Sequence, residues 1–406
     1  MVNRSKCPRL SVASMVAVTL LLALVSANAA HAQTFSVIHS FSGPDGDLPK
    51  GGLTIDRAGN LYGTTFAGFL GFGWGSVYQL RPHQLGWLFS VIQVYDGQPL
   101  DRPAIGPNGT LYGTNSNMIT IYRVGYLWNL SPPVNPCKSA FCFWLSNTLY
   151  GFGGGASGAT PLGAHLVFDQ AGNIYGTTSA GGTGNGVVYQ LSRSGVETPI
   201  YAFAGSPDGA TPYSGVIFDA AGNLYGVTEA GGASGNGAVY KLTPNGNGWS
   251  EQVIYSFTGG NDGKTPVGGL VIDQAGNLYG TTITGGANGG GTVFELSPNG
   301  GGWTYNLLNS FAGGSSCGPS AELTFDSAGN LYGTTYCDGA FNLGNVFKLT
   351  NSGGTWTYSS IHDFANGTDG KNPISNVIFD ASGKMYGTTS IGGMFAGGNV
   401  WQITQQ

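Results

Sequence analysis

Four acids stand where most other copies of a repeat that runs through this chain carry neutral residues: Asp101, Glu229, Glu322 and Asp338. His165 is the one histidine expected to start a strand near the same place. Carboxylates can hold a divalent metal such as Ca²⁺ or Mg²⁺, and a histidine beside that metal can act as a base. If these side chains converge, they predict a metal-dependent catalytic site. If they do not, they are solvated loop acids, which is the ordinary place for such residues.

A second candidate site is aromatic. One loop reads Phe66-Ala67-Gly68-Phe69-Leu70-Gly71-Phe72-Gly73-Trp74, where corresponding loops use Ala, Gly, Asn and Ser, and the last copy of the repeat offers Met394 and Phe395. Aromatic side chains are enriched at binding surfaces. We predict a platform for a sugar or a peptide, made by Phe66, Phe69, Phe72, Trp74 and Phe395. The alternative is that these side chains pack on one another and plug the opening between them.

A set of Asp-Gly pairs could bind calcium, and its acids are Asp45, Asp96, Asp208, Asp262 and Asp369. Calcium takes about six to eight oxygens from one site, whereas each copy of the repeat supplies one carboxylate. Turn formation explains these pairs better, because aspartate accepts backbone hydrogen bonds in turns. The chain contains no H-E-x-x-H pair or phosphate-binding loop, and its G-x-S-x-G string at Gly314 to Gly318 opens no helix, so no nucleophile elbow is predicted.

A tandem repeat must position all of these residues. Its clearest copy is the phrase from Asp273 to Thr282, and its tyrosine recurs at Tyr62, Tyr112, Tyr175, Tyr225, Tyr279, Tyr332 and Tyr386. Each copy contains four short apolar runs bounded by turn residues, which indicates strands. Asp-x-x-Gly-Asn between the first two runs predicts a type I turn followed by a bulge. Four antiparallel strands in each of seven copies predict an all-β, seven-bladed β-propeller.

The two ends of the repeat array are complementary. Residues Phe35 to Phe41 resemble the fourth strand of later copies, and the chain finishes with a third strand, Asn399 to Ile403. We therefore predict that the first strand completes the seventh blade, which closes the ring and leaves no free edge there. The propeller is expected to be a single domain over residues 33–406.

The first 32 residues predict export. Arg4, Lys6 and Arg9 precede an apolar run over residues 15–25, and small residues follow up to Ala32. This is the pattern of a signal peptide cleaved before Gln33, and the apolar run is shorter than the roughly 20 residues of a spanning helix. Cleavage would move the net charge from −5 to about −8, which disfavours nucleic acid as a partner. We expect a secreted monomer, extracellular or periplasmic, with no membrane span after cleavage.

Four cysteines remain after cleavage, an even number that suggests disulfides in an exported protein. Cys317 precedes the first strand of the sixth copy and Cys337 follows its second strand, so a hairpin would bring them to the same end. We predict the pairs Cys317–Cys337 and Cys137–Cys142, with the other pairings open. A metal site is the alternative, but the spacing contains no C-x-x-C pair.

The phrases D-x-A-G-N-L-Y-G-T-T, V-Y-x-L and I-Y-S-F-x-G-x-x-D-G resemble the GloVer tandem repeat of secreted bacterial proteins, over essentially all of residues 33–406. The resemblance implies sorting to the cell surface or exterior by varied terminal anchors, and it implies no shared activity; a C-terminal anchor is not recognised here. More distantly, Val271 to Tyr279 is similar to the NHL, gluconolactonase and streptogramin-lyase propellers, a likeness that concerns the fold and does not transfer chemistry.

Two functional hypotheses follow. The first is a noncatalytic exported propeller that needs no cofactor and binds a carbohydrate, a peptide or an envelope protein through its loop face. The second, suggested by the distant propellers, is a metal-dependent lactone hydrolase or lyase with a site at the channel mouth. Convergence of Asp101, His165, Glu229, Glu322 or Asp338 on one point would favour the enzyme. A glycine-lined, aromatic mouth would favour binding.

Overall fold

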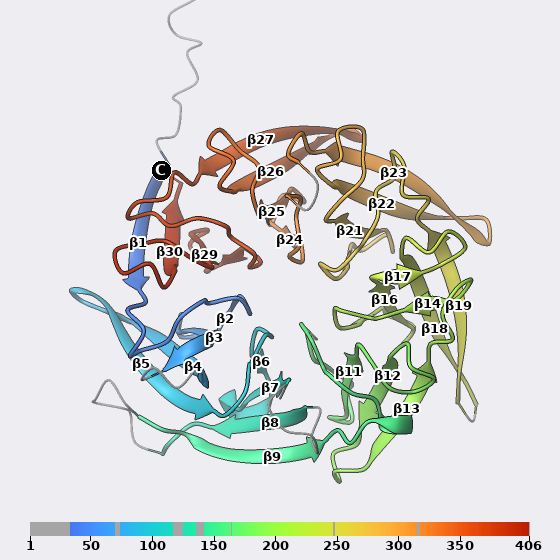
Figure 1. Cartoon of the computed structure of the whole chain (residues 1–406), viewed down its shortest axis with the longest axis horizontal. Helices are drawn as coiled ribbons and strands as arrows, with labels where there is room; N and C mark the ends of the chain where they lie inside the picture. Colours follow the sequence, from blue (N-terminus) through green and yellow to red (C-terminus); the bar gives the residue numbers. More distant parts are fainter. Residues whose placement is uncertain are drawn as a thin grey trace, which may run out of the picture.

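The computed structural model describes residues 33–69, 74–116, 125–134, 142–163, 165–246, 248–314 and 317–405, without the side chain of Phe69. Seven four-stranded antiparallel sheets stand as blades around a central channel, as Figure 1 shows. The predicted seven-bladed β-propeller is therefore confirmed. Within the described ranges, no helix is long and apolar enough to cross a bilayer.

Each blade is named here by its strands, from the channel outwards. Blade 1 contains β2 (Leu53–Ile55), β3 (Leu61–Phe69), β4 (Trp74–His83) and β5 (Gly86–Tyr95). Blade 2 contains β6 (Ala104–Ile105), β7 (Leu111–Asn115), β8 (Tyr126–Ser131) and β9 (Leu145–Gly151). Blade 3 contains β10 (Val167–Phe168), β11 (Ile174–Thr178), β12 (Val187–Leu191) and β13 (Glu197–Ala202). Blade 4 contains β15 (Ile217–Phe218), β16 (Leu224–Thr228), β18 (Ala238–Asn245) and β19 (Gly248–Ser256).

The remaining blades follow the same order. Blade 5 contains β20 (Val271–Ile272), β21 (Leu278–Thr282), β22 (Thr292–Asn299) and β23 (Gly302–Ser310). Blade 6 contains β24 (Thr324–Phe325), β25 (Leu331–Thr335), β26 (Asn345–Ser352) and β27 (Thr355–Asp363). Blade 7 contains β28 (Ile378–Phe379), β29 (Met385–Thr389), β30 (Asn399–Thr404) and β1 (Thr34–Ser40). Short additions are the pair β14 (Gly209–Ala210) and β17 (Ala230–Gly231), and the 3-10 turns η1 (Pro107–Gly109) and η2 (Gly155–Ser157).

The repeated Asp and Tyr form one local hydrogen-bond system in the turn between the first two strands. In blade 5, Asp273 Oδ1 accepts the backbone N–H groups of Ala275 and Asn277, both at 2.9 Å. Asp273 Oδ2 accepts the Tyr279 hydroxyl at 3.1 Å, and Gly276 adopts φ +85° at the bulge. The same Tyr to Asp bond recurs from Tyr62, Tyr175, Tyr225, Tyr332 and Tyr386. The repeated phrase therefore builds the turn.

The apolar core lies between neighbouring blades. Tyr225 and Val239 of blade 4, for example, pack in one cluster with Leu278 and Phe294 of blade 5. Threonines of the second strands add polar links, since each donates to a carbonyl of the next blade: Thr64 to Asp101, Thr177 to Ser214, Thr281 to Ala321, Thr334 to Ser375 and Thr388 to Pro49. Each blade is therefore stabilised by both neighbours.

Strand β1 closes the ring. It pairs with β30 from Thr34↔Thr404 to Ser40↔Asn399, and Figure 1 shows the two ends of the propeller side by side in blade 7. The Phe35 ring stacks on His362 of the neighbouring β27, at a centroid distance of 3.9 Å. The predicted closure of the last blade by the first strand is confirmed.

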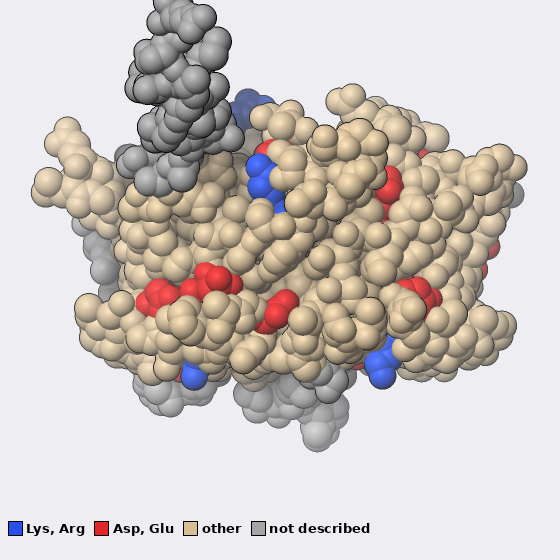
Figure 2. Space-filling model, turned by 90° about the horizontal axis from the view of Figure 1, so that it is seen from above, with Lys and Arg blue, Asp and Glu red and all other residues tan. Residues whose placement is uncertain are grey.

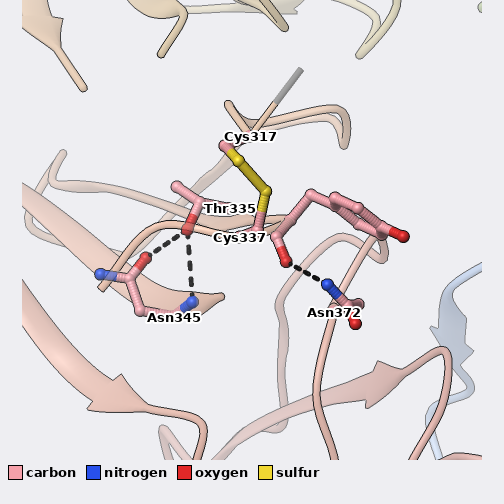
Figure 3. The surroundings of a disulfide bond; sticks show 6 residues. Cys317, Thr335, Cys337, Asn345 and Asn372 are labelled. Carbon is pink, nitrogen blue, oxygen red and sulfur yellow. Dashed lines mark hydrogen bonds between the residues drawn. A yellow bond between two sulfur atoms is a disulfide. The ribbon is translucent and has the colours of Figure 1, made fainter. Parts of the chain in front are cut away.

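The predicted disulfide between Cys317 and Cys337 is present and links the loops on either side of β24 and β25, as Figure 3 shows. Beside it, Asn372 of the next blade donates to the carbonyl of Tyr336 at 2.9 Å. Cys142 is also disulfide-bonded. Its predicted partner, Cys137, lies outside the described residues.

We expect the double variant Cys317→Ser/Cys337→Ser to lose about 2–3 kcal/mol of unfolding free energy, because the bond closes a loop with a sequence separation of 20 residues. Urea denaturation followed by circular dichroism measures this loss. Each single variant should lose as much as the double variant, since either substitution breaks the same bond. Additive losses would contradict this explanation.

Candidate functional site

The loops that leave the second and fourth strands lie on one face, the loop face. The loop after the second strand bonds to the loop that precedes the first strand of the same blade, as in Phe66 N–H to Leu48 C=O and Glu229 N–H to Thr211 C=O, both at 3.0 Å. Leu48, Thr211 and their equivalents also have positive φ, between 54° and 59°: Leu48, Thr160, Thr211, Thr265 and Asn372. A β-branched residue at positive φ is a true outlier, so the surrounding contacts must hold these loops in place.

The Asp-Gly pairs on this face form turns. Asp262 accepts Thr258 N–H at 2.7 Å and the Tyr255 hydroxyl at 3.0 Å. In blade 7, His39 replaces this tyrosine and its Nε2 lies 2.9 Å from Asp45. Asp208 and Asp369 likewise accept the backbone N–H groups of Ala204 and Ala365. Four of the five aspartates considered for calcium are therefore used by their own loops.

A cavity of about 390 Å³ occupies the channel where the innermost strands begin. Four of the five predicted enzyme residues line it: Asp101, His165, Glu229 and Glu322. Asp338 does not line it and lies beside the disulfide, where a Cβ added to Gly313 would be 2.9 Å from Cys317 Cβ and 3.6 Å from Asp338 Cβ. The sequence therefore placed most of the candidate residues at one cavity.

An ion pair that the sequence reasoning missed crosses this cavity. Arg102 Nη2 of blade 2 donates to Glu322 Oε2 of blade 6 at 2.8 Å, and it lies 3.1 Å from both ring nitrogens of His165. Arg102 and His165 also line a second cavity, formed with residues of the innermost strands β6, β10 and β15. Arg102 and His165 therefore lie between the two cavities. We name Arg102, His165 and Glu322 the partition, and the cavity on the loop-face side the upper cup.

The electrostatics of the partition disfavour base catalysis. Burial, and then the positive charge of Arg102, hold the pKa of His165 well below 6.5. A general base works best with a pKa near the operating pH, and a protonated His165 would face the Arg102 guanidinium. Burial raises the pKa of Glu322, an effect that Arg102 opposes, and burial also raises the pKa of Glu229.

The donor set also fits a metal poorly. Within the part of the chain that the structure describes, no three His, Cys, Asp or Glu side chains gather closely enough to hold a metal ion. The Arg102 guanidinium already neutralises Glu322. Asp101 accepts a hydrogen bond from the Thr114 hydroxyl and, through its carbonyl, one from Thr64. These residues join blades and bind cationic groups of the protein itself.

One register position supplies most of the partition. The position lies directly before the apolar residue that leads into the first strand of each blade; in blade 2 it lies before Pro103. In blade order its residues are Gly52, Arg102, His165, Gly215, Gly269, Glu322 and Asn376. Six of these seven residues, all but Gly52, line the upper cup, and Arg102 and His165 line both cavities. Aligning the copies here would have identified Arg102 and Asn376 as candidates.

Large apolar side chains are exposed in the second-to-third-strand loops of blades 6, 7 and 1. We name the set the aromatic arc: the exposed Tyr336, Phe341, Met394, Phe395 and Trp74, together with the half-buried Phe66; Phe66 and Trp74 lie in the ends of β3 and β4 that flank the loop of blade 1. Phe341 and Phe395 are 56% and 57% exposed, and Trp74 is 40% exposed. Phe72 and the side chain of Phe69 lie outside the described residues. Tyr336 and Phe341 are additions that the sequence reasoning missed, although Tyr336 occupies the position of Phe66 in its own copy of the repeat.

The three loops of the arc are joined by backbone hydrogen bonds. Asn372 N–H donates to Leu343 C=O, which links the loop of blade 6 to blade 7 at 2.7 Å. Leu48 N–H donates to Gly397 C=O, which links the loop of blade 7 to blade 1 at 3.0 Å. Lys50 lines the upper cup and its Nζ lies 4.3 Å from the centroid of the Phe66 ring. The arc is therefore continuous with the cup.

Charged side chains are few, and in Figure 2 they are scattered over the side of the ring between large uncharged areas. Only 9% of all residues are charged. The binding potential of the protein therefore lies in aromatic and neutral polar side chains more than in a charged surface.

Several solved structures are similar in fold. A protein provisionally assigned as a gluconolactonase has 10% identity and a TM-score of 0.45, with 92% of each chain covered. A provisionally assigned oxidoreductase (glucose dehydrogenase) of Thermus thermophilus has 13% identity and a TM-score of 0.46, with 92% of this chain and 100% of that chain covered. PorZ, a surface component of the type-IX secretion system of Porphyromonas gingivalis, has 14% identity and a TM-score of 0.44, with 81% of this chain and 43% of that chain covered.

No curated protein matches the sequence. The Gloeobacter/Verrucomicrobia repeat matches three overlapping segments, residues 25–217, 73–273 and 217–406, which include every blade. This agrees with the repeated turn, strand and loop phrases described above. The chain therefore belongs to the Gloeobacter/Verrucomicrobia repeat family.

Proposed function

We propose that this protein is an exported, noncatalytic carbohydrate-binding propeller that takes its ligand on the loop face. The aromatic arc is the observation that carries the proposal. Contiguous apolar side chains exposed on a rigid surface are typical of interaction sites. Sugar rings present apolar C–H faces that can stack on aromatic side chains, and their hydroxyls can pair with the Asn, Ser and Thr of neighbouring loops.

Export is supported by the predicted signal peptide over residues 1–32 and by the Cys317–Cys337 disulfide. Disulfides form and persist in oxidising compartments outside the cytoplasm. A periplasmic or extracellular carbohydrate is then an accessible partner. A peptide or an envelope protein is the other class of partner, and it is an outcome of the experiment below.

The enzyme hypothesis receives partial support, because four of its five residues line one cavity. Against it stand the Arg102–Glu322 ion pair and the lowered pKa of His165, which together leave little acid or base capacity in the partition. Hydrolysis or elimination at a divalent metal therefore remains the second candidate. Elemental analysis of the purified mature protein and thermal shifts with Ca²⁺ and Mg²⁺ test it.

The binding proposal predicts that Phe341→Ala/Phe395→Ala weakens glycan binding about tenfold or more, which corresponds to about 1.4 kcal/mol. A glycan array, followed by titration calorimetry on the best glycan, measures the effect. The control is Phe143→Ala, because Phe143 is 58% exposed but lies outside the arc, between Cys142 and Trp144, which bond to the outer strand β5. Binding that is absent in the wild type, or equal in the arc variant and the control, would refute carbohydrate binding. A pull-down on envelope extract in which peptides compete and glycans do not would favour a protein partner.

A further inference from the structure

The upper cup contains buried polar groups that the protein does not satisfy. Within the described residues, Asn376 Nδ2, Ser214 Oγ and Arg102 Nε have no hydrogen-bond partner. Asn376 and Ser214 are each only 5% exposed, and both line the cup. A buried polar group without a partner costs about 1–3 kcal/mol, so three such groups beside one cavity are candidates for hydrogen bonds to a ligand.

Glycines place these groups next to one another. A Cβ added to Gly52 would overlap Asn376 Oδ1 and lie 3.7 Å from Arg102 Cβ. A Cβ added to Gly269 would lie 3.6 Å from Ser214 Cβ and 3.7 Å from Glu322 Cγ. Since Arg102 binds Glu322, the polar groups form a row across the channel, and glycine at positions 52 and 269 lets its members approach one another.

The charges of the wall favour a neutral ligand. The cup is lined by two cations, Lys50 and Arg102, and by three carboxylates, Asp101, Glu229 and Glu322. A ligand of strong single charge would meet groups of the same sign. A hydroxyl both donates and accepts, so neighbouring hydroxyls can pair with the Asn376 and Arg102 donors and with carboxylate acceptors together.

The rest of the wall is mostly apolar and includes Tyr213, Val267, Ile283 and Ile374. A sugar ring has apolar faces as well as hydroxyls, and both find partners here. The cavity of about 390 Å³ equals roughly a dozen water volumes of about 30 Å³, which is enough for the about twelve heavy atoms of a hexose. The volume also lies in the range of small-molecule sites, about 300–1,000 Å³.

The arrangement of the two cavities favours binding of the end of a glycan chain over binding of its middle. The Arg102, His165 and Glu322 partition separates the upper cup from the lower cavity. The Arg102–Glu322 ion pair lies across the path from the cup to the lower cavity, whereas Lys50 and Phe66 connect the cup to the aromatic arc.

We infer that the upper cup binds the terminal, neutral sugar ring of a glycan whose following residues lie on the aromatic arc. Asn376, Ser214 and Arg102 donate to the hydroxyls of that ring. This inference rests on the proposed function. It adds that the cup, a site separate from the arc, recognises the end of the glycan.

The test uses saturation-transfer NMR and calorimetry on the full mature chain with glucose, galactose, mannose and N-acetylglucosamine, and with glucuronate as the charged probe. At least one neutral sugar should bind, and glucuronate should bind less tightly than glucose. Ser214→Ala should weaken the best sugar about fivefold, because it removes a hydroxyl with no protein partner and leaves the fold intact. Asn376→Asp should weaken it at least about tenfold, because it keeps the acceptor for Leu53 N–H but removes the amide donor. The control is Ser234→Ala, an exposed loop serine of blade 4.

The two sites can be distinguished by their variants. The arc variant Phe341→Ala/Phe395→Ala should lose affinity for the glycan and keep its affinity for the monosaccharide. Glycan binding that is unaffected by Ser214→Ala and Asn376→Asp would overturn the inference about the cup and leave the proposed function standing. If no monosaccharide binds, or if all variants bind as Ser234→Ala does, the cup holds only water and the inference is wrong. If neither glycans nor monosaccharides bind, both proposals fail.

Discussion

A variant that lacks residues 34–41 is expected to lose its cooperative folded state. The deletion removes β1, exposes β30 as a free edge and uncovers Trp401, which is fully buried against Phe35 and Phe364. It also removes Phe41, whose exposure is 0% and whose ring packs on Tyr78 and Phe89. A single buried Phe→Ala costs about 3–5 kcal/mol, and a typical domain is stable by about 5–15 kcal/mol, so the loss of a whole strand should exceed the total. Thermal circular dichroism and size-exclusion chromatography measure the result.

A circular permutant tests whether β1 is needed for its pairing with β30 or for its position at the start of the chain. The permutant begins at Ser42, runs to Thr404, and continues through a two-residue turn into Thr34–Phe41. Thr34 and Thr404 are register partners, and blade 5 joins the partners Asn299 and Gly302 by such a turn. This protein should fold with the wild-type spectrum, because all 28 strands of the blades remain paired. Wild-type melting of the deletion variant, or failure of the permutant to fold, would contradict the role assigned to β1.

The fold could be predicted because its signals are local. The Asp to Tyr bond of each turn spans six residues, as for Asp273 and Tyr279, so the sequence phrase contains both partners. The Cys317–Cys337 bond was predictable for the same reason, since a hairpin of known length lies between the two residues. Ring closure followed from the identity of the first and last strands. Each of these inferences needed only the order of strands along the chain.

The polar row of the cup could be predicted only in part. Arg102 and Glu322 are separated by 220 residues, and their contact depends on the diameter of the ring and the reach of the side chains. Sequence reasoning selected Glu322 by its deviation from other copies and His165 by its place at the start of a strand, but it did not consider Arg102 and Asn376. The arc shows a similar limit: Phe311 and Phe341 are the same residue type, yet Phe311 is 2% exposed and Phe341 is 56% exposed. Exposure depends on the blade that covers each loop.

Loss of the Arg102–Glu322 ion pair is the second change that we expect to have a large effect on stability. We expect Arg102→Ala to lower the unfolding free energy by about 3–5 kcal/mol at pH 8, because it leaves the Glu322 carboxylate enclosed without a counter-charge. Burial already raises the pKa of Glu322 above 4.5, and removal of Arg102 removes the effect that opposes this rise. A carboxyl with a raised folded pKa binds its proton more tightly in the folded state, so stability is lost as the pH rises from 4.5 through the folded pKa. The penalty of Arg102→Ala should therefore shrink toward pH 4.

Substitution of the partner, Glu322, should give a different pH dependence of the unfolding free energy. This difference distinguishes a charge effect from a packing effect. Glu322→Ala removes the titrating carboxyl and leaves a guanidinium that stays protonated at every accessible pH. The wild type alone then loses stability as the pH rises from 4.5 through the folded pKa of Glu322, so the penalty of Glu322→Ala should fall toward pH 8, opposite in sign to that of Arg102→Ala. The double variant Arg102→Met/Glu322→Leu removes both charges at similar volume and should cost about 1 kcal/mol or less, well below the sum of the single losses. Urea denaturation at both pH values measures these differences, with the exposed Arg193→Ala as the control for loss of one positive charge. Equal pH dependence of the two single variants, or additive losses in the double variant, would show that the partition is held by packing and not by charge. Arg102→Ala and Glu322→Ala also alter the cup. The double variant should stay folded, so its monosaccharide affinity, compared with that of the wild type, measures how much the two charged side chains contribute to binding.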